Sequence, residues 1–147
     1  MKKFQFLFLA LALVLVSVAA CRSSSEPAEP SFEDAWVRAL PTGSGMTAAF
    51  GTLNNPGPDA VEIVGFTSPE FGDVSLHRTE LEDGMSTMRE VRTFRIDPGS
   101  RLVLEPGGYH LMLMMPAADV QPGQSVVLVM NLADGRTFSF RVPVEKR

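Results

Sequence analysis

The sequence predicts an all-β sandwich in a single domain. Turn signals built from Gly, Pro, Asn and Asp recur about every 8 to 14 residues, and the segments between them are apolar. Several segments alternate apolar and polar residues, as half-buried strands do, and none shows a capped apolar repeat of 3.6 residues. A chain of 147 residues, 45% apolar and 20% charged, suits one globular domain.

The expected strands in the first half are bounded by residues that break strands. Residues 36–40 end at Pro41, and residues 46–54 stop at the Asn-Pro-Gly-Pro run of 55–58. Two further strands are expected after this run, at residues 60–67 and 73–79.

Each expected strand in the second half follows a short turn rich in glycine and proline. These turns lie at residues 82–84, 97–99, 105–108, 121–123 and 134–135. The strands that they introduce are expected at residues 87–96, 101–104, 109–115, 125–132 and 137–144.

The N-terminus has the order of a secretory signal. Lys2 and Lys3 precede an uncharged apolar run at 6–16, which is shorter than the roughly 20 residues of a membrane span. The sequence Val18-Ala19-Ala20-Cys21 then resembles a bacterial lipobox. This implies that residues 1–20 are a signal peptide and that Cys21 is lipidated, anchoring the protein to a membrane. The alternative is an ordinary secreted protein cut after Ala20.

We expect residues 21–33, rich in Ser, Pro and Glu, to form a flexible tether, and residues 34–147 to form the folded domain.

Composition and cysteine usage exclude several classes of protein. Residues 21–147 carry 11 Lys and Arg against 17 Asp and Glu, so we expect no nucleic-acid partner. A single Cys excludes an internal disulfide, a CxxC redox pair and a Cys-rich zinc site.

Both histidines lie in expected strands together with methionine. Alternation places His110 and Met112 on one strand face, about 6.7 Å apart at roughly 3.3 Å per residue. His77 falls on the polar side of its strand, and Met88 follows in the next. The set offers two imidazoles and two thioethers, which together favour Cu(I) over zinc, calcium or magnesium.

Other metal chemistries fit the sequence less well. Zinc prefers Cys, a third His or a carboxylate, and a blue-copper centre needs a Cys thiolate. The only thiol stands at the lipobox. A methionine taken alone is more often core filler than ligand, and this is the expectation for Met46, Met85, Met114, Met115 and Met130.

The spacing His77-x10-Met88-x21-His110-x-Met112 resembles the copper signature of the PCu(A)C-type periplasmic copper chaperones. The similarity runs from about Asp34 to Val144. The flanking segments that agree are Asp34-Ala35-Trp36-Val37-Arg38, residues 46–51, Asn54-Asn55, Ser75-Leu76-His77, Gly84-Met85, Met88-Arg89 and residues 106–113.

This resemblance implies a cupredoxin-like Greek-key β-sandwich or barrel that binds one Cu(I) per chain through His77, Met88, His110 and Met112. It also implies delivery of copper to the CuA or CuB site of a haem–copper (cytochrome c) oxidase, directly or with a Sco-type thiol protein. Some members carry a His- and Met-rich C-terminal tail that takes Cu(II). This sequence ends at Arg147 without one, so a second, Cu(II) site is not expected.

The sequence therefore favours a monomeric copper carrier in the cell envelope, lipid-anchored and facing the periplasm or the exterior, and not an enzyme. Copper sequestration or resistance is an alternative with the same chemistry, and a metal-free adhesion or scaffold lipoprotein is a third possibility. No nucleophile-elbow or triad context surrounds Ser75 or Ser86, which argues against a hydrolase. Because a ligating imidazole must be neutral, Cu(I) affinity is expected to weaken as pH falls through about 6.5.

Overall fold

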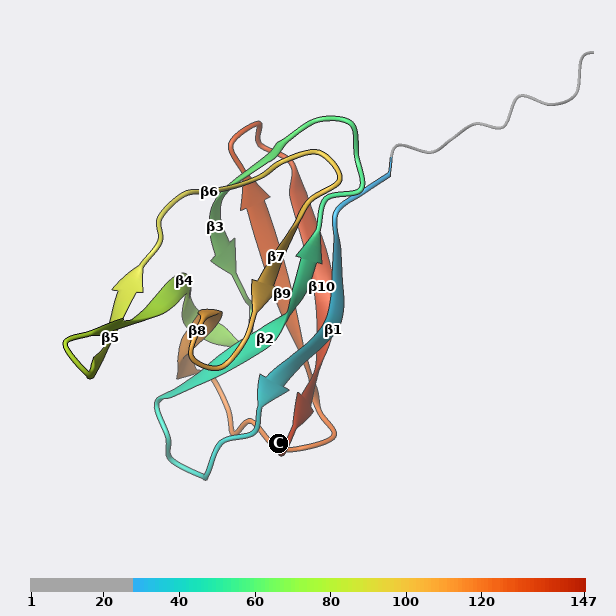
Figure 1. Cartoon of the computed structure of the whole chain (residues 1–147). Helices are drawn as coiled ribbons and strands as arrows, with labels where there is room; N and C mark the ends of the chain where they lie inside the picture. The colour runs from blue at the N-terminus through green and yellow to red at the C-terminus, as the bar shows by residue number, and fades with distance from the viewer. Residues whose placement is uncertain (1–27) are drawn as a thin grey trace, which may run out of the picture.

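The computed structural model describes residues 28–147, and every regular element in that range is a strand (Figure 1). The predicted signal peptide and the lipidation site at Cys21 lie outside the described residues. The strands are β1 (Ser31–Arg38), β2 (Met46–Asn54), β3 (Val61–Thr67), β4 (Phe71–Glu82), β5 (Met85–Glu90), β6 (Phe94–Ile96), β7 (Arg101–Leu104), β8 (Tyr109–Pro116), β9 (Ser125–Leu132) and β10 (Thr137–Glu145). No helix among the described residues is long and apolar enough to span a bilayer.

The strands form a sheet that closes on itself. Their order is β5-β4-β8-β7-β2-β1-β10-β9-β3-β6, and the pairing of Phe66 in β3 with Val74 in β4 joins the two ends of the ring. The strands β5 and β6 lie outside this ring as appended edges. Most neighbours are antiparallel, but β1 and β10 run parallel through Val37 and Val144. The prediction of an all-β sandwich or barrel is confirmed.

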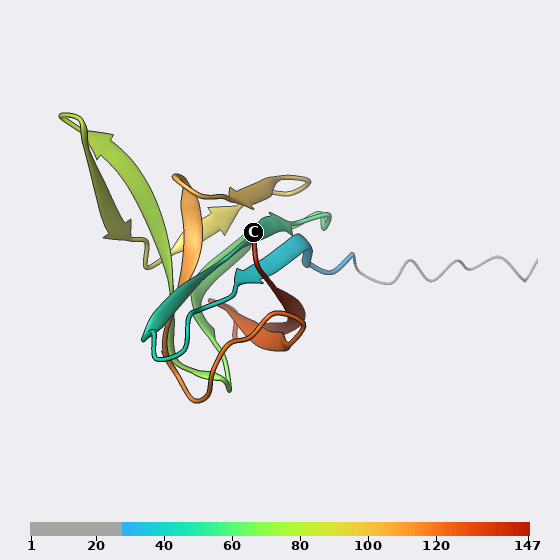
Figure 2. The same cartoon turned by 90° about the horizontal axis from the view of Figure 1, so that it is seen from below.

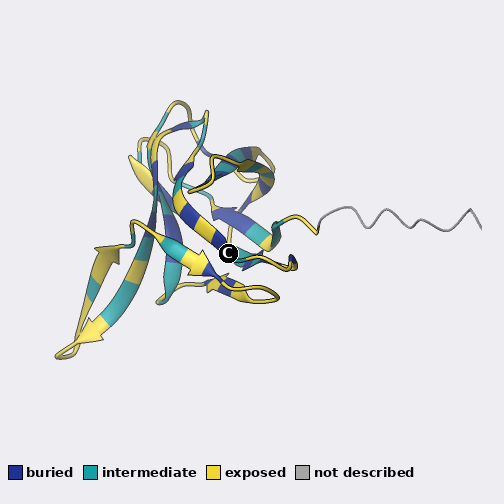
Figure 3. Cartoon of the chain, turned by 90° about the horizontal axis from the view of Figure 1, so that it is seen from above, coloured by how far each residue is buried: buried dark blue, intermediate teal, exposed yellow. Residues whose placement is uncertain are grey.

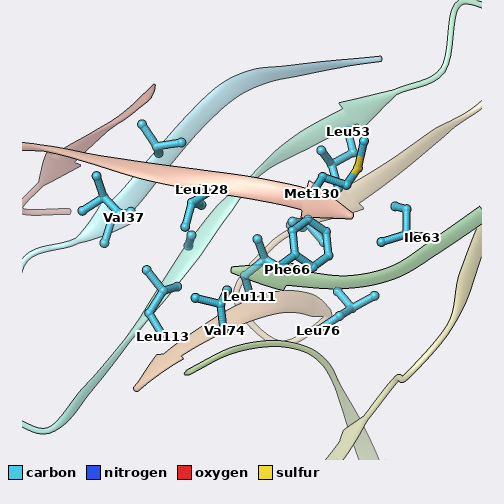
Figure 4. Packing of buried hydrophobic residues seen from close by; sticks show 14 of the residues in the cluster. Val37, Leu53, Ile63, Phe66, Val74, Leu76, Leu111, Leu113, Leu128 and Met130 are labelled. Carbon is cyan, nitrogen blue, oxygen red and sulfur yellow. The ribbon is translucent and has the colours of Figure 1, made fainter. Parts of the chain in front are cut away.

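The core fills the ring with one face of each strand (Figure 4). In β8, Leu111 and Leu113 are fully buried, and Val74 and Leu76 of β4 lie beside them. Leu128 and Met130 meet them from β9 on the opposite wall. Because side chains alternate along a strand, the residues between these positions point to the outer face of β4 and β8.

The strand β2 changes its partner half-way along its length. Residues 46–49 pair with β8, whereas residues 51–54 pair with β7. The turn at 105–108 joins β7 to β8 at this point, and Gly107 adopts the left-handed conformation (φ 84°) that its tight reversal needs. This turn therefore lies beside Phe50, where one partner strand gives way to the other.

The strands β4 and β5 form a hairpin that projects from the barrel as an arm (Figures 1 and 2). Its turn has positive φ at Asp83 (50°) and Gly84 (79°), as a two-residue type I′ hairpin turn requires. Most of the arm is exposed or half-buried (Figure 3). Ion pairs from Arg89 to Glu82 (2.8 Å) and from Arg78 to Glu80 (3.3 Å) line one face of the arm.

Three segments differ from the sequence-based expectation. The strand expected at 73–79 is longer and runs over Phe71–Glu82. The single strand expected at 87–96 is two strands, because the chain leaves β4 after Val91 donates to the Leu76 carbonyl (2.7 Å) and then pairs with β3 instead. The strand β1 begins at Ser31, which pairs with Asn54, so residues 31–33 of the expected tether are in the sheet.

Candidate metal centre

The four predicted ligands come from three neighbouring strands on the outer face of the barrel wall. His77 of β4 and His110 of β8 are direct cross-strand partners, with ring centroids 5.9 Å apart. Met112 lies two residues beyond His110, and Met88 of β5 is the cross-strand partner of Thr79, two residues beyond His77. The strand register thus places all four side chains on one face.

A pocket of about 330 Å³ opens over this face. Met88, His110 and Met112 line it, while His77 lies beside His110 and is not part of its lining. The arm supplies one wall of the pocket, and β2 and the β7–β8 turn supply the others. The remaining lining residues are Arg38, Leu40, Met46, Thr47, Ala48, Phe50, Thr79, Pro106 and Gly107.

Exposure differs sharply among the predicted ligands. His110 is only 6% exposed, beneath the turn and beside Phe50, whose ring centroid is 6.4 Å away. Met88, carried by the projecting arm, is 56% exposed. The pocket therefore has a fixed, buried end at His110 and an open end at Met88.

A hydrogen bond donated to the backbone fixes the orientation of His110. Its Nδ1 lies 3.2 Å from the carbonyl oxygen of Gly108, which can only accept a hydrogen bond. Nδ1 therefore carries the proton, and the lone pair of Nε2 is free to bind a metal. The Gly108 carbonyl also accepts from the N–H of Thr79 (3.0 Å), so the same turn anchors β4.

His77 is oriented through a serine. Ser75 Oγ lies 3.0 Å from Nε2 of His77 and donates its own hydrogen to Oδ2 of Asp73 at 3.5 Å. In the tautomer that carries its proton on Nε2, His77 donates this hydrogen bond to the serine oxygen. Nδ1 then holds the lone pair, and it is buried without any hydrogen-bond partner. An orphaned buried nitrogen beside soft donors fits a metal ligand.

Burial lowers the pKa of His77 below its ordinary value, and the neighbouring imidazole of His110 lowers it further. The carboxylates of Glu90 and Asp73 oppose this shift. The result is an imidazole that stays neutral, and so able to bind a metal, to a lower pH than a free histidine would.

Sequence reasoning missed the residues that orient the two rings. Alternation already placed Ser75 on the same face as His77, and this was the only available signal for it. The carbonyl of Gly108 gives no signal at all, because it belongs to the backbone. Within residues 28–147, no three His, Cys, Asp or Glu side chains gather as a cluster.

Comparison with known proteins shows the family and the fold of this chain. A family model described as "Putative lipoprotein LpqE-like" matches residues 31–144, nearly the whole described domain. The chain belongs to the LpqE-like lipoprotein family. It is 44% identical over 112 residues to "Putative lipoprotein Lxx21020" of Leifsonia xyli subsp. xyli (strain CTCB07). The match covers 76% of this LpqE-like chain and 66% of that protein, which is just under two thirds of its length.

Solved structures confirm that this LpqE-like protein has the PCu(A)C-type fold. The solution structure of CuI-DR1885 from Deinococcus radiodurans matches with a TM-score of 0.67 and 29% identity, over 88% of this chain and 87% of that one. The copper-bound PCuAC domain from PmoF2 matches with a TM-score of 0.67 and 18% identity, over 83% and 97%. The expected cupredoxin-like barrel and the resemblance to PCu(A)C-type proteins are therefore both confirmed.

Replacing Ser75 by alanine is expected to weaken Cu(I) binding about tenfold or more, because groups that orient metal-bound histidines typically contribute 10- to 100-fold. Without the hydroxyl, nothing holds the His77 ring or keeps its proton on Nε2. Chelator competition measures the affinity, and nitrogen-15 NMR of the imidazole reports the tautomer. Ser86→Ala, on the exposed arm, is the matched control. A Ser75→Ala protein with unaltered affinity and tautomer would contradict this role.

Proposed function

We propose that this protein is a copper carrier of the cell envelope that binds one Cu(I) per chain through His77, Met88, His110 and Met112. The observation that carries the proposal is the convergence of two imidazoles and two thioethers on one sheet face, with one imidazole nitrogen buried and unpartnered. Thioether and neutral imidazole are soft, uncharged donors, a combination that favours Cu(I).

The gradient of exposure suits a carrier better than a permanent cofactor site. His110 is buried and held by the Gly108 carbonyl, whereas Met88 is exposed on β5, a strand that pairs with β4 alone. An acceptor can displace the exposed thioether first and the buried imidazole last. Ligand-by-ligand exchange of this kind releases the ion without unfolding the barrel.

Similar proteins support the choice of metal. Two similar solved structures are described as copper-bound and as CuI-loaded. The resemblance to PCu(A)C-type proteins further supports delivery to haem–copper oxidase assembly, through an oxidase subunit or a Sco-type thiol protein. In this proposal the protein is exported, anchored by lipid at Cys21, monomeric, and a carrier without catalytic activity.

The proposal is tested by anaerobic Cu(I) competition between the purified protein and a chromogenic chelator. We expect tight binding of one Cu(I) per chain. A deletion strain then separates the two copper roles: loss of oxidase activity at low copper supports delivery, and sensitivity to high copper supports sequestration. If the protein cannot compete with the chelator, the copper proposal fails and a metal-free scaffold role replaces it.

The affinity for Cu(I) is expected to change little from pH 8 to 7 and to fall as the pH drops further. Protons compete for the ligating imidazoles, and an ordinary histidine is half-protonated near pH 6.5. Because the pKa of His77 is lowered, its competition begins below that value. Chelator competition across this pH series is the measurement. An affinity that already declines between pH 8 and 7 would contradict the assignment of His77.

A further inference from the structure

Two methionines that the four-ligand site does not use stand side by side further along the same face. Met46 of β2 and Met114 of β8 are direct cross-strand partners. The neighbouring N–H of Met115 donates to the carbonyl of Gly45 at 2.9 Å. This bond flanks the pair, so Met46 and Met114 are not hydrogen-bonded to each other. Side chains approach most closely in such pairs, where the Cα atoms are about 4.5 Å apart.

Packing in the core does not account for these two side chains. Met46 is 56% exposed and Met114 is half-buried, and neither belongs to the hydrophobic core. The contrast is Met130, which is 1% exposed and packs at the centre of the barrel. An exposed methionine gains little from burial, but its thioether is accessible to a soft ion.

The pair is continuous with the candidate metal centre. Met46 lines the same pocket as Met112 and His110, whereas Met114 lies beside Met46 and is not part of the lining. Met112 and Met114 lie two residues apart on β8, about 6.6 Å at roughly 3.3 Å per residue. Ala48, the cross-strand partner of Met112, fills little of the space above the strand. Met112 therefore lies between the thioether pair and the histidines.

The charged groups nearby leave this end of the face open to a cation. Asp73 of β4 is the cross-strand partner of Met114 and is exposed. Arg38 also lines the pocket, but its guanidinium stacks over Phe50 at 5.1 Å and Trp36 at 6.0 Å. The carboxylate beside Met114 favours a cation at this position, and the two thioethers favour a soft one.

We propose that Met46 and Met114 form a second, thioether-only site for a soft monovalent ion, and that Met112 links it to the His77–His110 end. This inference rests on the proposed copper function. It adds a position that Cu(I) occupies first during loading or last during release. The site binds more weakly than the four-ligand site, because it is exposed and has no imidazole. Its binding is independent of pH, because thioethers need no deprotonation, unlike imidazoles.

The test uses Ag(I), a soft ion of the same charge as Cu(I), with the methionine methyl groups labelled with carbon-13 for NMR. In the unmodified protein, the first equivalent is expected to shift Met88 and Met112, and the second Met46 and Met114. In the His77→Ala/His110→Ala variant, Met46 and Met114 are expected to respond with equal affinity at pH 7.5 and pH 5.0. Met46→Leu, close in volume, is expected to abolish the second equivalent.

Met85→Leu is the matched control, because Met85 is also exposed but lies at the tip of the arm, away from the pocket. The inference is overturned if Met46 and Met114 do not shift while Met88 and Met112 do. It is also overturned if Met85 shifts in parallel with Met46, which would show non-specific binding to exposed thioethers. A first equivalent that leaves Met88 and Met112 unshifted would instead count against the four-ligand site itself.

Discussion

Replacing His110 with alanine is expected to lower the apparent Cu(I) affinity by about a hundredfold or more. Groups that merely orient a ligating histidine contribute 10- to 100-fold, so loss of the ligand itself should exceed that range. His110 is the most buried of the four predicted ligands, and the Gly108 carbonyl already holds its ring in place. Anaerobic chelator competition measures the effect, and a folded barrel is verified from the Trp36 fluorescence.

The matched control for His110→Ala is Met115→Leu. Met115 is a potential thioether donor five residues along the same strand, 63% exposed and absent from the pocket lining. This control is expected to retain the parent affinity, while Met112→Ala should weaken binding as His110→Ala does. Unchanged affinity in both His110→Ala and Met112→Ala would show that Cu(I) does not bind on this face.

The alternation of apolar residues was enough to predict most of the barrel from the sequence. The strands at 46–54, 101–104 and 125–132 have the expected bounds. In each of them, breakers flank a run whose alternate residues enter the core, so burial and local turn chemistry agree. The segment at 87–96 was harder, because its change of partner from β4 to β3 depends on contacts distant in sequence.

Alternation fails to predict the side-chain direction where the backbone leaves the regular strand conformation. Alternation along β8 would place Met115 on the inward face with Leu111 and Leu113, but its side chain is 63% exposed. Met115 adopts a left-handed conformation (φ 54°), which turns the side chain out of the strand pattern. Its expected role as core filler is therefore wrong, and so are those of Met46 and Met85, which are 56% and 71% exposed. The same expectation for Met130 is confirmed.

The candidate site is also only partly predictable from the sequence. Period-two alternation predicts that His110 and Met112 share a face and that His77 lies on the polar side of its strand. The pairing of β4 with β8, which brings His77 opposite His110, is known only from the structure. The register of the arm brings Met88 opposite Thr79 and depends on the two-residue turn at Asp83. From the sequence alone, Met88 is a candidate because a thioether is a suitable ligand for Cu(I). The identity of the four ligands stays a prediction until binding is measured.

Replacing Asn55 with alanine is expected to lower the free energy of unfolding by about 3 kcal/mol, because each buried polar group left unpaired costs about 1 to 3 kcal/mol. The Asn55 side chain is 2% exposed. Its Nδ2 donates to the carbonyls of Asp59 (2.8 Å), Ile96 (3.0 Å) and Asp97 (3.2 Å), and its Oδ1 accepts from the Gly57 N–H (3.2 Å). One amide thus ties the β2–β3 loop to the β6–β7 turn.

Urea denaturation followed by Trp36 fluorescence measures this loss, and Asn54→Ala is the matched control. Asn54 is the preceding residue, half-buried, with one long hydrogen bond to Ser31 Oγ (3.4 Å), so its loss should cost less than about 0.5 kcal/mol. Asn55→Asp tests the donor role separately, because a carboxylate accepts from Gly57 but cannot donate to three carbonyls. It should therefore destabilise at neutral pH despite its matched shape. If Asn55→Ala lowers the free energy of unfolding by less than about 1 kcal/mol, water replaces the hydrogen bonds of the Asn55 amide and the expected role is contradicted.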